Sequence, residues 1–306
     1  MSDQVLRRGL LSPLFVAGLG TAALAQQAKA RLQGFASADA AASAFTEAVR
    51  KSDVAALRSM LGESWVNSVL DERNDPSGHR RAYLAAWDAK HALALDGNRA
   101  TLAVGNDGWT LPIPIVKDGA EWRFDVADAE RQVLARQIGH DEYGAIQTLL
   151  AIVDAQYEYV EREPTKSGWP QYARRLRSSP GKRDGLYWPA APGEPASPLG
   201  EALAESQFDG KAPGAHFGYN FRLLYAQGPA ADGGAHDYLV DGRLLGGFGA
   251  IAVPLIYGET GVMTFIVNYK GVVYQQDLGR ETAPRAGAIA AFNPDQGWKK
   301  ADLTPP

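Results

Sequence analysis

The side chains best suited to binding or chemistry lie together in SPGKRDGLYWP, residues 179–189. Arg183 offers a planar guanidinium fork, and Tyr187 and Trp188 offer rigid apolar surfaces with polar tips, as is typical of binding hot spots. The stretch is therefore a candidate binding surface. The alternative is structural: Tyr187 and Trp188 anchor a long loop on a sheet, while Arg183 and Asp184 pair at its bend. We favour loop anchoring, because an ordered loop must offset its conformational entropy.

Other chemical motifs are incomplete. Gly247–Ala252 matches G-x-G-x-x-A, but Val253-Pro254 continues a strand pattern where a dinucleotide site needs a helix. We interpret these glycines as strand positions that another backbone or an aromatic ring approaches closely. The chain has 5 His without the i, i+4 spacing of a metal pair, no Cys, and no G-x-S-x-G motif. We therefore expect no metal, no cofactor and no catalytic residue, although a site assembled from dispersed residues stays open.

The first residues have the order of a secretory signal peptide. Arg7 and Arg8 precede an apolar run that ends in Ala23-Leu24-Ala25, whose small side chains suit signal peptidase. We predict a signal peptide over residues 1–25 and a mature chain that begins at Gln26. The arginine pair resembles a twin-arginine signal only weakly, so the export route stays open. This predicts a periplasmic or extracellular protein without a transmembrane segment in its mature chain.

Length and composition indicate a globular protein of two domains. The chain has 306 residues, of which 45% are hydrophobic and 22% charged, as in ordinary soluble proteins. Its net charge of −4 gives no electrostatic attraction to phosphate backbones, so we expect no nucleic-acid partner.

Residues 26–130 are predicted to form a small α+β domain. Two short amphipathic helices, divided at Ser52-Asp53, precede two hairpins that turn at Asp96-Gly97 and Asp118-Gly119. Pro112 and Pro114 restrict the second hairpin to an edge or a bulge. The order of elements resembles the cone of cystatin-like or nuclear-transport-factor-2-like folds.

Residues 131–279 are predicted to contain a long amphipathic helix, a Pro/Gly-rich loop at 163–217 and an antiparallel meander. We expect Asp141 to cap the helix after Gly139 ends any preceding turn. The predicted apolar face consists of Ile146, Leu149, Leu150, Val153, Tyr157 and Val160. Residues 280–306 are predicted to be a loose tail, within which Gln296 to Lys300 can dock through Trp298.

Several strings in this half resemble one family. IGHDEYGAIQTLLAIVDAQYEY, SPGKRDGLYWP, Gly218-Tyr219-Asn220-Phe221 and YGETGVMTFIVNYKGVVYQQDLG together resemble the domain of unknown function 2950 family of secreted bacterial proteins, from about Phe35 to Gly279. This family carries no known activity, so the resemblance transfers no catalytic residues to this chain. The final meander also looks like the globular sheet of type IV pilins and pseudopilins, although the pilin processing site is absent.

These observations favour an exported envelope protein that binds rather than catalyses. Its partner would be another envelope protein or a small apolar or glycan-like ligand. Trp109 and Trp122 mark a candidate pocket in the N-terminal domain. The alternatives are a periplasmic hydrolase and a structural component of a pilus-like or secretion assembly.

Overall fold

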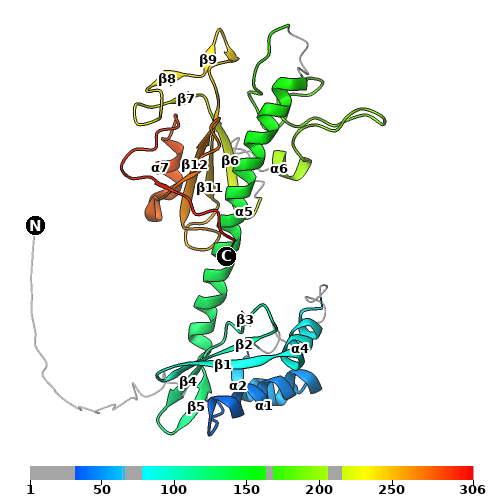
Figure 1. The fold of residues 1–306 in the computed structure, drawn as a ribbon, viewed down its shortest axis with the longest axis vertical. Helices are drawn as coiled ribbons and strands as arrows, with labels where there is room; N and C mark the ends of the chain where they lie inside the picture. Colours follow the sequence, from blue (N-terminus) through cyan, green and yellow to red (C-terminus); the bar gives the residue numbers. More distant parts are fainter. Residues whose placement is uncertain (1–31, 64, 66–77, 163–167, 206–215, 306) are drawn as a thin grey trace, which may run out of the picture. The chain divides into compact units, whose positions relative to one another are not determined.

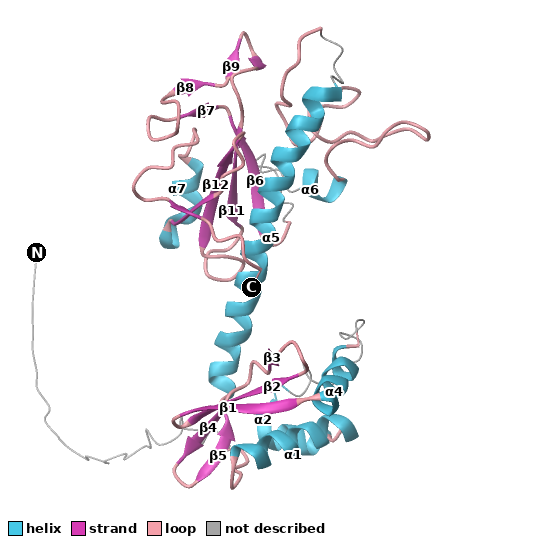
Figure 2. Cartoon of the chain, in the orientation of Figure 1, coloured by secondary structure: helices cyan, strands magenta, loops and turns pink. Residues whose placement is uncertain are grey.

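The computed structural model describes residues 32–63, 65, 78–162, 168–205 and 216–305. The predicted signal peptide lies outside these residues. The chain forms two compact units, Met1–Val126 and Ala127–Pro306, so the division falls a few residues before the predicted domain boundary. Helices and antiparallel sheets occur in both units, which confirms the α+β class (Figures 1 and 2).

Helices α1 (Ala38–Lys51), α2 (Val54–Leu61) and α4 (His79–Ala89) build the helical side of unit 1. The first two begin at side-chain caps, because Ser37 accepts a hydrogen bond from the Ala40 amide and Asp53 accepts one from the Ala56 amide. Ser52 ends α1 in the left-handed conformation, which confirms the division predicted at Ser52-Asp53.

The sheet of unit 1 has the order β1-β2-β4-β5, with β3 also paired to β2. Its strands are β1 (His91–Asp96), β2 (Arg99–Val104), β3 (Trp109–Thr110), β4 (Ile115–Asp118) and β5 (Glu121–Phe124). The registers Asp96↔Arg99 and Asp118↔Glu121 place the two hairpin turns as predicted. Pro112 and Pro114 lie in the break between β3 and β4, because proline cannot donate a ladder hydrogen bond.

The core of unit 1 lies between this sheet and the helices. Helix α1 contacts β4 and β5, and α4 contacts β1 and β2. Along β2, Ala100, Leu102 and Val104 are buried, and they alternate with more exposed residues, which shows one face of the strand turned to the core.

Unit 2 contains helix α5 (Val126–Arg162), which is a single helix of 37 residues. The prediction that Asp141 caps a new helix is wrong. The Gln137 side-chain amide donates to the Asp141 carboxylate at 2.8 Å, one turn away, so Asp141 is accommodated inside the helix. Gly139 also lies inside α5, because a glycine in a helix interior lowers helix stability by only about 1 kcal/mol relative to alanine.

The buried face of α5 differs in part from the predicted one. Ile146, Leu149 and Val153 are buried as predicted, but Tyr159 is buried in place of Tyr157, which is 42% exposed. Tyr157 lies at the edge of the buried face, where its hydroxyl donates to the Tyr269 carbonyl at 2.6 Å.

The main sheet of unit 2 has the order β14-β13-β12-β11-β6, with every pair antiparallel. Its strands are β6 (Tyr219–Leu224), β11 (Gly249–Pro254), β12 (Met263–Asn268), β13 (Tyr274–Asp277) and β14 (Lys299–Lys300). The predicted meander is thus confirmed. Two ribbons flank it, β7 (Ala226–Gln227) with β8 (His236–Asp237), and β9 (Leu239–Val240) with β10 (Arg243–Leu244).

The G-x-G-x-x-A match lies in and before β11, as the strand interpretation predicts. A Cβ added to Gly247 would lie 2.7 Å from the Tyr269 ring, and the φ of Gly247 is +132°. The close ring therefore requires glycine here, and no helix follows that could bind a pyrophosphate.

The prediction of a loose C-terminal tail is wrong for residues 280–300. A 3₁₀ turn (Gly279–Glu281) and α7 (Thr282–Gly287) follow β13, and Lys299 pairs with Gln275 through β14. Phe292 is 3% exposed in a hydrophobic cluster with β6, β11 and β12, and Trp298 packs against the same cluster. The segment is ordered because it buries a face of the sheet that would otherwise expose apolar side chains.

Residues 168–205 contain little regular structure, as predicted, apart from α6 (Glu201–Glu205). Gln156 of α5 fastens this loop, since its side-chain amide donates to the Ala173 carbonyl at 2.9 Å and accepts from the Ala173 amide at 2.8 Å. Leu176, Leu186 and Trp188 join the core cluster of α5 and the main sheet.

Candidate functional site

Unit 1 contains a cavity of about 690 Å³ lined by residues of α1, α4, β2, β3 and the segment that follows β3. Two charged side chains, Arg80 and Asp107, are part of its lining. The other lining residues are Phe45, Val49, Trp65, Ala82, Tyr83, Ala86, Val104, Trp109, Leu111, Pro112 and Ile113. This size and an apolar lining with few polar groups are typical of small-molecule sites.

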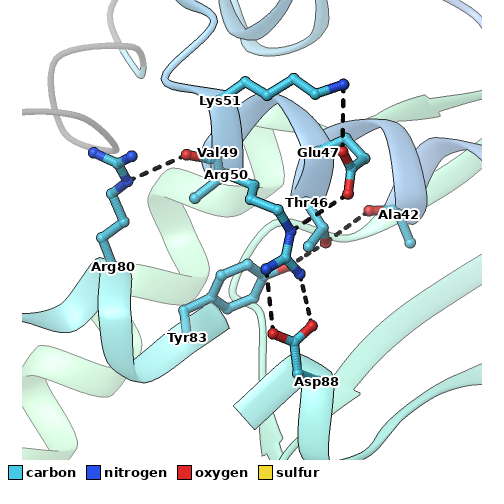
Figure 3. A network of polar contacts seen from close by, with 9 residues as sticks. All are labelled: Ala42, Thr46, Glu47, Val49, Arg50, Lys51, Arg80, Tyr83 and Asp88. Carbon is cyan, nitrogen blue, oxygen red and sulfur yellow. Dashed lines mark hydrogen bonds and ion pairs between the residues drawn. The ribbon is translucent and has the colours of Figure 1, made fainter. Parts of the chain in front are cut away.

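Polar contacts, drawn in Figure 3, join α1 and α4, which both contribute lining residues to this cavity. The Arg50 guanidinium meets the Asp88 carboxylate with two contacts of 3.2 and 2.6 Å. The hydroxyls of Thr46 and Tyr83 share a hydrogen bond of 2.8 Å, and Arg80 Nε donates to the Val49 carbonyl at 3.2 Å. These contacts fix the rotation of α4 against α1.

Tyr83 presents a neutral ring to the cavity. Burial raises the pKa of Tyr83 to about 12, although its hydrogen bond to Thr46 acts in the opposite direction. Because the hydroxyl is bonded to Thr46, the ring contributes mainly apolar surface. The edge of the Trp109 ring system lies against it, with centroids 6.4 Å apart.

The two tryptophans predicted to mark this pocket have different positions. Trp109 on β3 is 46% exposed and lines the cavity. Trp122 on β5 pairs with Phe35 through two backbone hydrogen bonds of 2.8 Å, and it is not a lining residue. The structure therefore brings only Trp109 to the cavity.

Sequence reasoning missed α4 and with it Tyr83. The signal was present in HRRAYLAAWDA, where Tyr83 and Trp87 have the i, i+4 spacing of one helical face. The two arginines before Tyr83 and the short length of the segment weakened that pattern.

Unit 2 contains a second cavity, of about 490 Å³, at the stretch SPGKRDGLYWP. Arg183, Tyr187 and Trp188 line it, and Asp184 does not. Trp188 is 6% exposed and belongs to the core cluster, where the edge of its ring system faces Tyr159 at a centroid distance of 6.4 Å. Tyr159 also donates from its hydroxyl to the Arg183 carbonyl at 2.5 Å.

Arg183 and Asp184 do not pair with each other, which corrects the expected contact across the bend. Arg183 forms an ion pair of 2.7 Å with Glu194, and its guanidinium carbon lies 5.5 Å from the Trp188 ring centroid. Asp184 accepts from both the amide and the hydroxyl of Ser179, at 2.7 and 2.9 Å. Adjacent side chains diverge here because each finds a partner on another turn of the loop.

Asp184 stays ionised well into acid. Partial burial raises its pKa, but the hydrogen bonds from Ser179 and the charge of Arg175 outweigh burial, so the pKa lies below its ordinary value. The carboxylate thus acts as a cap for the Ser179 turn rather than as a proton donor.

The described parts of the chain contain neither a cluster of metal-ligating side chains nor a helix that could span a membrane. Within residues 32–63, 65, 78–162, 168–205 and 216–305, no group of three or more His, Asp or Glu residues could hold a metal ion. The helices in these ranges are each too short or too polar to span a bilayer.

Comparison with known proteins identifies a family but no characterised relative. No curated protein and no solved structure matches the chain significantly. The cystatin-like, nuclear-transport-factor-2-like and pilin-like resemblances therefore stay predictions. One family model, described as a protein of unknown function (DUF2950), matches residues 32–301. Since this match covers most of the chain, the protein belongs to the DUF2950 family.

Proposed function

We propose that this protein is an exported, non-enzymatic binding protein whose N-terminal unit holds a small, uncharged, apolar molecule. The observation that carries the proposal is the cavity of about 690 Å³ lined mainly by aliphatic and aromatic side chains. Its volume lies within the range of about 300–1,000 Å³ that encloses most of a drug-sized ligand.

The polar groups of this cavity favour binding over catalysis. Asp107 is the one carboxylate among the described lining residues, whereas acid–base hydrolysis of a glycoside needs two. Arg80 Nε and the Tyr83 hydroxyl are engaged with the Val49 carbonyl and the Thr46 hydroxyl, so these two groups serve the fold. A ligand would gain most of its affinity by removing apolar surface from water.

A matched pair of variants on α4 tests this proposal. Ala86 lines the cavity, whereas its neighbour Ala85 is exposed and does not. N-Phenyl-1-naphthylamine, an uncharged apolar fluorophore, should bind the parent protein with a saturable rise in fluorescence. Ala86→Asp should weaken this binding about tenfold or more, because it places a charge against the apolar probe.

Ala85→Asp is the control, since it adds the same charge and the same helix propensity one residue away. It should bind the probe like the parent, and circular dichroism should show both variants folded. Absence of saturable binding by the parent, or equal loss in both variants, would contradict a ligand site in this cavity.

Export forms the second part of the proposal, and its support is the Arg7-Arg8, apolar-run and Ala-Leu-Ala order of residues 1–25. Expression of the full chain in a bacterial host should yield a periplasmic or secreted species that begins at Gln26. Intact-mass analysis of envelope and medium fractions measures this. A major species that retains Met1 would argue against cleavage, whatever the outcome of the probe experiment.

A further inference from the structure

The cavity in unit 2 differs in charge from the one in unit 1. Its lining is Arg177, Ser178, Ser179, Pro180, Gly181, Lys182, Arg183, Tyr187, Trp188 and Pro189. Three of these side chains are cationic, and none of the described lining residues is acidic. A concave surface with one sign of charge concentrates ions of the opposite sign.

A tight turn places Lys182 in the wall of this cavity. The Lys182 amide donates to the Ser179 carbonyl at 2.9 Å, which closes a four-residue turn. Pro180 and Gly181 occupy its central positions, and Gly181 has a φ of +71°. This is the sequence and conformation of a type II turn, so the backbone that carries Lys182 is well defined.

The two arginines are held in place by aromatic rings and acidic partners. Arg177 lies 5.1 Å from the Tyr187 ring centroid, and Arg183 lies 5.5 Å from that of Trp188. Each guanidinium also contacts a carboxylate outside the lining, Glu201 at 3.5 Å for Arg177 and Glu194 at 2.7 Å for Arg183. Stacking of this kind orients a guanidinium at little entropic cost.

Lys182 supplies the uncompensated charge. Within the described residues it forms no ion pair, whereas Arg177 and Arg183 each have an acidic partner. Asp184, the carboxylate nearest in sequence, accepts hydrogen bonds from Ser179 and forms an ion pair of 3.8 Å with Arg175. Lys182 therefore adds a positive charge without an acidic partner among the described residues, beside two oriented guanidinium groups.

The rest of the lining favours an apolar ligand body over a sugar. Ser178 Oγ accepts from the Gly185 amide at 3.0 Å and donates to the Gly185 carbonyl, and Ser179 Oγ donates to Asp184. Both hydroxyls are thus used by the loop itself. Pro180, Pro189 and the two aromatic rings provide apolar surface, so sugar hydroxyls would lose more hydrogen bonds to water than they regain.

We infer that this cavity binds a small organic acid, with its carboxylate or phosphate against Lys182 and the two arginines and its apolar body against the prolines and rings. The volume of about 490 Å³ exceeds what an inorganic ion fills, so the body contributes to affinity. This site belongs to unit 2 and is independent of the apolar ligand proposed for unit 1.

Isothermal titration calorimetry with benzoate, phenyl phosphate and benzyl alcohol tests the inference on the full mature chain. These probes share a ring and differ in the charged group. At least one of the two acids should bind about tenfold or more tightly than the alcohol, because a hydrogen bond to a charged group is the stronger one. The acid that binds more tightly shows whether the site prefers a carboxylate or a phosphate. Added salt should weaken its binding.

Three lysine variants separate a site from a general charge effect. Lys182→Gln should weaken binding of the more tightly bound acid about tenfold. Lys182→Arg should keep most of this affinity, because it preserves the charge. Lys300→Gln removes an exposed positive charge from β14 in the same unit and should bind like the parent. Lys182 is exposed, so thermal unfolding of all three should match the parent.

Several results would overturn the inference. These are binding of the alcohol that equals the acids in affinity and is weakened by Lys182→Gln, equal loss of acid binding in the Lys182→Gln and Lys300→Gln variants, and no heat of binding for either acid at millimolar concentration. If benzyl alcohol binds the unit 1 cavity, neither lysine substitution should change its affinity. The two proposed sites can therefore be tested separately, and a negative result for one does not conceal a negative result for the other.

Discussion

Trp188→Ala should lower the free energy of unfolding by about 3–5 kcal/mol, as removal of a buried aromatic side chain does. The Trp188 side chain is 6% exposed and packs in the cluster that joins α5, the main sheet and the loop. Its removal leaves a cavity beside Tyr159 and takes away the ring over which Arg183 lies. Urea denaturation followed by far-ultraviolet circular dichroism measures the change.

Trp169→Ala is the matched control for this variant. Trp169 lies in the same loop region but is 61% exposed, so its replacement should change the free energy of unfolding by no more than about 0.5 kcal/mol. If Trp188→Ala unfolded at the same urea concentration as the parent, Trp188 would not anchor the loop. The stretch at 179–189 would then have to be interpreted as a binding surface alone.

Gly185→Ala should destabilise the same loop by about 1–3 kcal/mol, as overpacking does. A Cβ at this position would lie 2.6 Å from the carbonyl carbon of Arg177 and from the amide nitrogen of Ser178. These are backbone atoms, so they cannot turn away as a flexible side chain can. The two segments would separate, which strains the hydrogen bond of 2.8 Å from the Ser178 amide to the Tyr187 carbonyl.

Gly200→Ala serves as the control for the loss of a glycine. Among the described residues other than its chain neighbours, no atom lies within 4 Å of a Cβ added to Gly200, so alanine there should leave the urea midpoint nearly unchanged. Hydrogen exchange of the Ser178 and Tyr187 amides should also increase in Gly185→Ala and not in the control. Equal midpoints for both variants would show that the loop tolerates separation of its two segments.

Local chemistry was enough to predict much of unit 1 from the sequence. The turns at Asp96-Gly97 and Asp118-Gly119 formed where glycine permits a positive φ, and Pro112 and Pro114 interrupted a strand because they lack an amide proton. The cavity was predicted only in part. Trp109 was identified, but Tyr83 lies on a short helix whose apolar spacing was weak.

Non-local contacts explain the errors in unit 2. Asp141 is a good N-cap residue in isolation, but inside α5 its carboxylate is satisfied by Gln137. Residues 280–300 have no strong period of their own, and they are ordered because Phe292 and Trp298 meet a sheet face built from distant strands. No sequence window of ordinary length contains both sides of such contacts.

The sequence by itself determined the α+β class, the hairpin turns, the presence of an antiparallel meander and the stretch where Arg183, Tyr187 and Trp188 gather, because these depend on residues close along the chain. Only the tertiary structure decided which charges pair and where concave surfaces form. Arg183 meets Glu194 rather than adjacent Asp184, and Lys182 is left beside two oriented guanidinium groups. The reason is physical: burial and ion pairing depend on distances in space, which the fold sets by bringing together segments that are separated in sequence.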